Sequence, residues 1–151
     1  MILAAYRSGL YNLLYLGHIV TIVIAFAPAV INPILGAQVR SDGEDTARRV
    51  SAHMATNGAR VHFPALVLSA AFGLGLVIES DPLYGFDQAW VSLAFLVWLA
   101  LCGVVTGIIL PAERRLAAGD AAAERLVGRG GGIATVLLLV MLYLMIWKPG
   151  V

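Results

Sequence analysis

The sequence is poor in cysteine and in charge. Cys102 is the only cysteine among 151 residues, which excludes an intrachain disulfide and a metal cluster built on cysteine thiolates. Charged residues make up 13% of the chain against 60% hydrophobic residues, and this balance excludes an ordinary soluble domain. The net charge of +1 gives no support to a nucleic-acid partner. The composition instead indicates the lipid bilayer as the partner of this chain.

Formal charge is absent altogether from four long stretches. They cover residues 8–39, 61–78, 88–112 and 130–147. About 18 or more apolar residues are enough to cross the hydrocarbon core of a bilayer as an α-helix, and lipid cannot hydrogen-bond to an irregular backbone. The sequence therefore predicts an all-α polytopic membrane protein, a four-transmembrane-helix bundle that forms one domain over residues 1–151. The expected spans are about 9–36, 61–79, 88–111 and 131–147.

The connections between the spans differ in charge. Arginines occupy the first and third connections, namely Arg40, Arg48, Arg49, Arg60, Arg114, Arg115, Arg125 and Arg129. The second connection, residues 79–87, contains acidic residues and no basic residue. Basic connections tend to stay on the cytoplasmic side of a membrane. We therefore expect a multi-pass protein of the bacterial inner (plasma) membrane, with both termini on the external side.

Prolines and glycines predict where the helices bend or break. Pro28 and Pro33 lie inside the first span and are expected to kink it. The polar segment 45–60 is compatible with a helix that runs on into the second span. Residues 41–44, Ser-Asp-Gly-Glu, match a capping box at the start of that helix. The glycine-rich segment 128–132 is expected to form a flexible break before the fourth span.

Small residues recur four positions apart in two of the spans. The pairs are Ser69/Gly73, Ala71/Gly75 and Gly103/Gly107. Such pairs let helix backbones approach closely in lipid, where no hydrophobic force drives the helices together. They predict tight packing inside one bundle or, alternatively, a seam between two copies of the chain in a homo-oligomer.

His18 is the most informative single residue. It lies about ten residues, or roughly 15 Å, from the outer end of the first span, which places it near the middle of the bilayer. An ionisable group at that depth is costly and indicates a functional site by default. Neutral imidazole is also a common ligand of metals and of haem iron. The alternative is a neutral histidine that hydrogen-bonds to a helix-facing hydroxyl such as that of Ser69.

Depth along the spans predicts the partners that His18 can reach. Met141 of the fourth span lies at the same level, so a haem b with His18 and Met141 as ligands of the iron fits sterically. Arg60 is then a candidate contact for a haem propionate. The alternative role of Met141 is to fill space in the core.

The other histidines do not complete a metal site with His18. Nine residues of α-helix turn through about 900°, so His53 and His62 are expected on opposite faces of one helix. His62 is expected at the cytoplasmic mouth of the second span, far in height from His18. The absence of an acidic residue in mid-span also disfavours a carboxylate proton relay or a cation-coupled transporter.

Several short motifs resemble one group of membrane proteins. They are Leu16-Gly17-His18-Ile19-Val20, Met54, Pro64-Ala65, Phe72-Gly73-Leu74, Trp90 and Trp147-Lys148-Pro149. Together they resemble the HemJ-type membrane protoporphyrinogen oxidases and the related CopD-like and uncharacterised four-helix families. In the HemJ-type enzymes a histidine of helix one and a lysine of helix three form the functional pair. His18 matches the histidine, whereas Ala94 stands where the lysine is expected. The resemblance thus implies the four-helix fold and a haem-linked role for His18 rather than the oxidase activity.

Two classes of function follow. The first is an integral membrane protein of the HemJ-like type that binds haem or takes part in redox chemistry through His18. The second is a non-catalytic small subunit or assembly factor of a larger membrane complex, because the chain is almost wholly apolar and lacks a catalytic constellation. Transport of a small solute or metal has less support, since Met141 and Met145 are only neighbours on one helix.

Overall fold

The chain folds into helices that follow its apolar stretches. The computed structural model describes residues 8–80 and 83–150, and no strand occurs among them. The α-helices are α2 (Gly9–Val39), α3 (Glu44–Asn57), α4 (Phe63–Glu79), α5 (Ala89–Val104), α6 (Leu110–Ala117) and α7 (Ala123–Trp147). Three shorter elements connect them: the 3₁₀ turn η1 (Arg40–Asp42) and the π-turns η2 (Gly58–His62) and η3 (Val105–Ile109).

Two pairs of these helices join end to end. The elements α3, η2 and α4 form one continuous helix of 36 residues, and α5, η3 and α6 form another of 29 residues. With α2 and α7, the described part of the chain contains four helices that are long and apolar enough to cross a membrane. The prediction of an all-α chain with four such helices is therefore confirmed. A 36-residue helix is about 54 Å long, so it extends well beyond a hydrocarbon core of roughly 30 Å.

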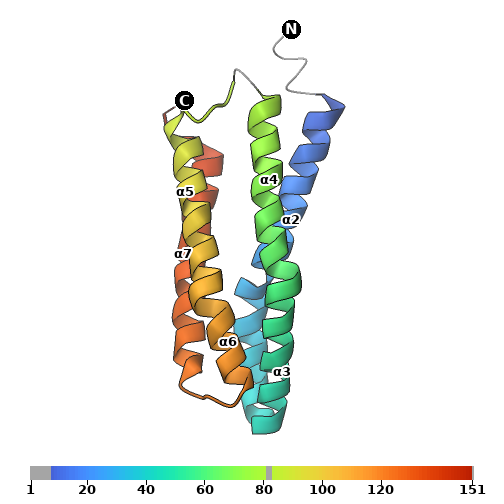
Figure 1. Ribbon diagram of the computed structural model, residues 1–151, viewed down its shortest axis with the longest axis vertical. Helices are drawn as coiled ribbons and strands as arrows, with labels where there is room; N and C mark the ends of the chain where they lie inside the picture. Colours follow the sequence, from blue (N-terminus) through green and yellow to red (C-terminus); the bar gives the residue numbers. More distant parts are fainter. Residues whose placement is uncertain (1–7, 81–82, 151) are drawn as a thin grey trace.

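The four long helices run up and down and form a bundle (Figure 1). The start of α2, the α4–α5 connection and the end of α7 lie at one end of the bundle. The α2–α3 and α6–α7 connections lie at the other end, which we call the arginine-rich end because Arg48, Arg49, Arg114 and Arg115 lie there. The first and third connections thus share one end, as the charge pattern predicts.

Glycines set the close contact between α2 and α4. A Cβ on Gly73 would lie 3.2 Å from the His18 ring, and a Cβ on Gly75 would lie 3.1 Å from Leu14. Gly73 and Gly75 of α4 therefore pack inside the bundle, as predicted, whereas Ala71 is exposed. Gly103 and Gly107 differ, because an added Cβ at either would meet nothing within 4 Å in the described part of the chain. For this pair the prediction of a seam between two copies stays open.

Two local predictions are wrong. The glycine-rich segment 128–132 is not a break, because α7 runs through it without interruption. Neighbouring apolar side chains stabilise the helix there, and a Cβ on Gly130 would lie 2.8 Å from Ile109. The capping box at residues 41–44 does not form either. Gly43 occupies the N-cap with φ 96°, and the Ser41 hydroxyl donates to the carbonyl of Gln38 instead.

The α6–α7 turn is held by Asp120. Its Oδ1 accepts the backbone N–H of Ala122 at 3.0 Å, and its Oδ2 lies 2.6 Å from the Arg115 guanidinium. The hydrogen bond from Arg115 holds the pKa of the Asp120 carboxyl below its usual value. Gly119, with φ 95°, supplies the left-handed conformation that the turn requires.

Polar contacts join the elements at the opposite end of the bundle. The Ser8 hydroxyl donates to Glu79 at 2.8 Å and ties the start of α2 to the end of α4. Lys148 donates to the Tyr84 hydroxyl at 2.7 Å and lies over the Trp90 ring, so it ties the end of α7 to the start of α5. The lysine of the Trp-Lys-Pro ending therefore fastens two elements in this fold.

Candidate functional site

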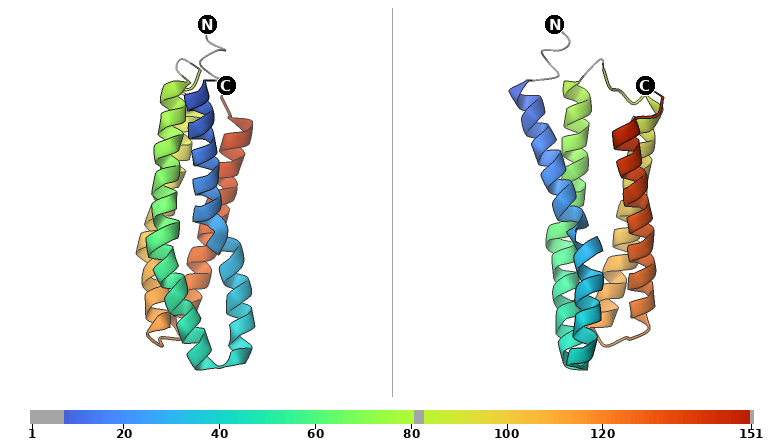
Figure 2. Two further views of the ribbon diagram at one scale, coloured as in Figure 1. Left: turned by 90° about the vertical axis from the view of Figure 1, so that its right-hand side faces the viewer. Right: turned by 180° about the vertical axis from the view of Figure 1, so that it is seen from behind.

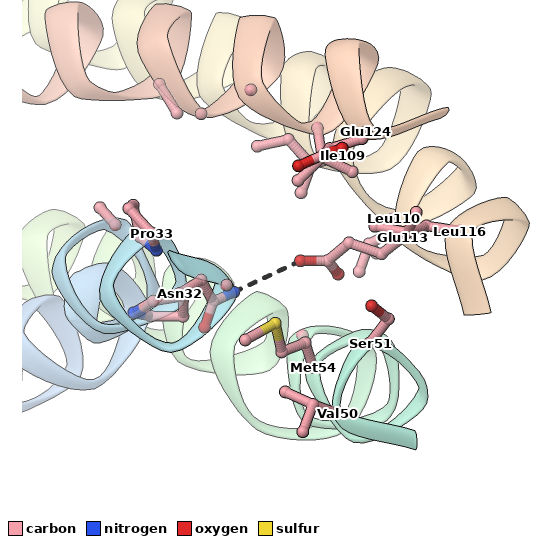
Figure 3. Close-up of a pocket in the computed structure, with 18 of the residues that line it drawn as sticks. Asn32, Pro33, Val50, Ser51, Met54, Ile109, Leu110, Glu113, Leu116 and Glu124 are labelled. Carbon is pink, nitrogen blue, oxygen red and sulfur yellow. Dashed lines mark hydrogen bonds between the residues drawn. The ribbon is translucent and has the colours of Figure 1, made fainter. Parts of the chain in front are cut away.

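The bundle encloses a cavity in its arginine-rich half. The cavity has a volume of about 830 Å³ and is lined by the second half of α2, by α3, η2 and the start of α4, by the end of α5, η3 and α6, and by the first half of α7. Figure 3 shows side chains from these elements around the open space. Ligand sites in proteins typically measure about 300–1,000 Å³, so the cavity has the size of a small-molecule site.

A proline in α2 creates one wall of the cavity. Figure 2 shows that α2 changes direction near its middle, where Pro28 has no N–H to donate to the carbonyl of Ile24. His62 fills this gap, because its Nδ1 lies 2.7 Å from the Ile24 carbonyl oxygen. A carbonyl only accepts, so Nδ1 must carry the proton. The bend of α2 is thus matched by a histidine on the neighbouring helix.

The two π-turns shape the opposite walls. Each π-turn ends two residues before a proline: η2 two residues before Pro64, and η3 two residues before Pro111. In each turn the last N–H bonds five residues back, from Phe63 to Gly58 and from Leu110 to Val105. Both π-turns contribute residues to the cavity lining. Single π-turns of this kind are frequent at functional sites because they re-aim side chains within a helix.

The lining is apolar toward the middle of the bundle and mixed toward the arginine-rich end, where charged side chains lie among Val50, Met54 and Leu116. Toward the middle of the bundle it consists of Phe26, Phe63, Leu66, Leu101, Val105 and Ala134. Toward the arginine-rich end it includes Glu44, Arg48, Ser51, Glu113 and Glu124. The face of α3 that lines the cavity carries Ala47, Val50, Ser51 and Met54, at positions that recur with the period of a helix. A polarity gradient therefore runs along the length of the cavity.

Glu113 is the most unusual residue of this site. Its side chain comes from α6, only 5% of its surface is exposed, and it lies close to η2, where a Cβ on Gly58 would be 3.2 Å from its Oε2. Its Oε1 accepts a hydrogen bond from Asn32 Nδ2 at 3.4 Å (Figure 3). Its Oε2 has no hydrogen-bond partner among the described residues. Burial of an incompletely paired carboxylate costs several kcal/mol, which marks the position as one kept for a ligand or a proton.

His18 lies in the seam between α2 and α4 and does not line the cavity. Its Nδ1 lies 2.7 Å from the carbonyl oxygen of Ser69, so the ring donates to the backbone of α4. Ser69 is the residue expected from depth, but the acceptor is its carbonyl. The Ser69 hydroxyl donates to the carbonyl of Leu66 instead.

The other residues of the predicted haem site lie elsewhere. Met141 packs against buried residues of α5 and α7, among them Ala94, which occupies the position expected for the family lysine. Arg60 lies exposed on η2. Neither Met141 nor Arg60 lines the cavity. The haem ligand set of His18, Met141 and Arg60 therefore stays a prediction.

Sequence analysis did not single out Asn32 and Glu113. Asn32 lies in the uncharged first stretch, but its polar side chain is a signal, because polar residues within a transmembrane helix usually face the interior of the bundle. Glu113 directly follows the uncharged stretch 88–112, and it stands beside two arginines at a place where charged residues are common. The rotation of α6 about its axis buries Glu113 and leaves the neighbouring Arg114 and Arg115 exposed.

Comparison with known proteins gives no relative for this site. No protein-family model matches the chain, and no curated protein or solved structure shows significant similarity to it. Within the described residues, no group of three or more His, Cys, Asp or Glu side chains is placed to hold a metal ion.

Proposed function

We propose that this protein binds a lipid-like amphiphile in the cavity of its arginine-rich half. The polar head of the ligand would lie at Asn32 and Glu113, and its apolar body would extend along Phe26, Leu66 and Leu101. The observation that carries this proposal is the polarity gradient of the lining, which matches the two ends of such a molecule.

The position of the cavity relative to the bilayer agrees with such a ligand. If Glu79 lies at one edge of the hydrocarbon core, about twenty residues of helix bring the other edge to about residue 60. The apolar lining residues of α4 then lie within the hydrocarbon, whereas Ser51 and Met54 lie at the level of the lipid head groups. An amphiphile in the cavity would keep the depth and orientation that it has in the surrounding leaflet.

A ligand could enter the cavity from the membrane on the side between α2 and α7. These two helices make few contacts with each other, while each packs against its other neighbour. On α7 the wall is formed by Gly128, Gly131 and Gly132, where an added Cβ would meet nothing within 4 Å. A ligand can therefore enter sideways from the lipid without separating packed side chains.

A HemJ-like, haem-linked role of His18 is the second candidate. It is favoured by the bond from Nδ1 to the Ser69 carbonyl, because this bond leaves Nε2 as the ring nitrogen for a metal. The amphiphile-binding role needs no catalytic group and also suits a non-catalytic subunit or assembly factor of a larger membrane complex, or a homo-oligomer, in a bacterial inner membrane.

Binding of a neutral probe tests the proposal. N-dodecyl dansylamide is added to the protein in nanodiscs, and energy transfer from tryptophan to dansyl is measured. Trp98 serves as a donor near the cavity, because its Nε1–H donates to the carbonyl of the lining residue Leu66 at 2.9 Å. We expect saturable transfer in the wild type.

Two glycine substitutions provide a matched pair for this measurement. Gly132→Leu places a side chain in the cavity wall and should weaken probe binding about fivefold or more. Gly103→Leu adds the same side chain in open space away from the cavity and should leave probe binding unchanged. Equal binding by the two variants, or non-saturable transfer in the wild type, would contradict the proposed function.

A further inference from the structure

The polar side chains beside Glu113 offer several hydrogen-bond acceptors. Asn32 donates one of its two Nδ2 hydrogens to Glu113 Oε1, and the amide oxygen of Asn32 remains an acceptor. The Ser51 hydroxyl donates to the carbonyl of Ala47 at 2.9 Å, so its oxygen also remains an acceptor. Figure 3 shows Asn32, Ser51 and Glu113 directed toward one region of the cavity. A ligand group that donates hydrogen bonds therefore finds three acceptors in this region, namely Glu113 Oε2, Asn32 Oδ1 and Ser51 Oγ.

Among the described side chains, no cation forms an ion pair with Glu113. Arg48 and His62 are the basic residues of the cavity lining in the described part of the chain. Arg48 is exposed and pairs with Glu44 at 3.4 Å, and the Nδ1–H of His62 is taken by the Ile24 carbonyl. The lining thus includes the carboxyl group of Glu113, whose Oε2 is buried and has no hydrogen-bond partner among the described residues.

We infer that the head group of the ligand is a primary ammonium, so that the cavity takes alkylamines or aminolipids whose amine is exposed. An ammonium group carries a positive charge and three N–H donors, which match Glu113 Oε2, Asn32 Oδ1 and Ser51 Oγ. This inference rests on the proposed function and narrows it to one chemical class.

Other head groups fit the same side chains less well. A quaternary ammonium supplies charge but no donor, so it leaves the three acceptors unsatisfied. An alcohol supplies one donor and no charge. A carboxylate or phosphate meets the buried carboxylate with like charge. The expected order of affinity is therefore amine, quaternary ammonium, alcohol and carboxylate.

Displacement of the dansyl probe at pH 7 tests the inference with four ligands of equal chain length. They are dodecylamine, dodecyltrimethylammonium, dodecanol and dodecanoate. We expect dodecylamine to displace the probe from the wild type at about tenfold lower concentration than dodecanol, because hydrogen bonds between an ammonium and a carboxylate are charge-assisted. Glu113→Gln should reduce this preference to about twofold and leave the affinity for dodecanol nearly unchanged.

Two further variants complete the experiment. Asn32→Leu removes one acceptor and should lower the preference for dodecylamine by a smaller factor than Glu113→Gln. Asp45→Asn removes an exposed carboxylate of α3 that does not line the cavity, and it should leave the preference intact. Thermal unfolding checks that each variant is folded, and retention of dodecanol binding in Glu113→Gln shows that its cavity persists.

The outcomes separate the inference from the proposed function. If dodecylamine and dodecanol displace the probe equally from the wild type, or if Glu113→Gln keeps the full preference, the ammonium inference is overturned while amphiphile binding stands. If the wild type shows no saturable binding of the neutral probe, the proposed function itself fails, and the inference fails with it.

Discussion

His62 hydrogen-bonds to a backbone carbonyl of α2 that a proline leaves without its helical donor. Pro28 leaves the Ile24 carbonyl without its helical partner, and His62 supplies a donor from another helix. His18 makes the reverse connection, because it donates from α2 to the Ser69 carbonyl of α4. Each of the two histidines therefore forms a hydrogen bond that connects two helices.

His62→Ala should destabilise the protein by about 1–2 kcal/mol, because it leaves the Ile24 carbonyl, within the span expected to lie in lipid, without a donor. Pro28→Ala restores a backbone N–H in α2, so the double variant should recover part of this loss. Thermal unfolding in detergent, followed by circular dichroism, measures the double-mutant cycle. His53→Ala, at an exposed position of α3, is the control and should change stability by less than about 0.5 kcal/mol. Additive effects of the two substitutions would contradict the fastening role of His62.

The haem-linked role of His18 makes a separate prediction at the same scale. Protein produced with ample haem supply should show a Soret absorption band, and His18→Ala should lose it, because the iron loses its ligand. His62→Ala is the control and should keep the band. A colourless wild type under these conditions would remove haem b, together with Met141 and Arg60 as its partners, from the description of this protein.

At the scale of elements, the glycines of α7 serve two different purposes. Gly130 is buried against η3, where a Cβ would lie 2.8 Å from Ile109 and 3.1 Å from Ile108. Gly131, the next residue, would place a Cβ in open space. Gly130 therefore allows α7 and η3 to approach closely, whereas Gly131 leaves its part of the cavity wall without a side chain.

Substitution by alanine at these two neighbouring glycines should change the stability of the protein in opposite directions. Gly130→Ala forces the isoleucines of η3 to shift and should destabilise the protein by about 1–3 kcal/mol. Gly131→Ala meets no side chain and should stabilise α7 by about 0.5–1 kcal/mol through helix propensity. Thermal unfolding in detergent compares the two. A change in stability of the same sign for both variants would indicate that the segment behaves as the flexible break expected from its composition.

At the scale of the whole molecule, the positions of the connections determine how the chain can sit in a membrane. The connections at the arginine-rich end share one face of the bundle, and the α4–α5 connection lies at the other (Figure 1). The distribution of arginine predicts that the arginine-rich end is cytoplasmic. The cavity and Glu113 would then face the cytoplasmic leaflet.

Single-cysteine variants on a Cys102→Ala background test this orientation. Ser41→Cys and Ala121→Cys lie exposed in the two connections of the arginine-rich end, and Phe86→Cys lies exposed in the α4–α5 connection. In intact cells a membrane-impermeant maleimide should label residue 86 and spare residues 41 and 121. After permeabilisation all three should react, which controls for accessibility. Labelling of 41 and 121 in intact cells would reverse the proposed orientation.

The sequence by itself determined the class of this protein and the depth of its residues. Apolar length identifies the helices, because lipid permits no other structure for such segments. The fixed rise of a helix places His18 level with Ser69, and the structure joins these residues at 2.7 Å. Both properties are local, so they can be read along one chain.

The tertiary structure alone decided which residues meet in the cavity. The apolar spans carry side chains of similar polarity on all sides, so their sequences do not encode the rotation of each helix about its axis. That rotation buries Glu113 beside Asn32 while its neighbours Arg114 and Arg115 stay exposed. The separation of α2 from α7 likewise follows from the bend at Pro28 and from packing against α4. The site therefore depends on relations between helices, which no single stretch of sequence contains.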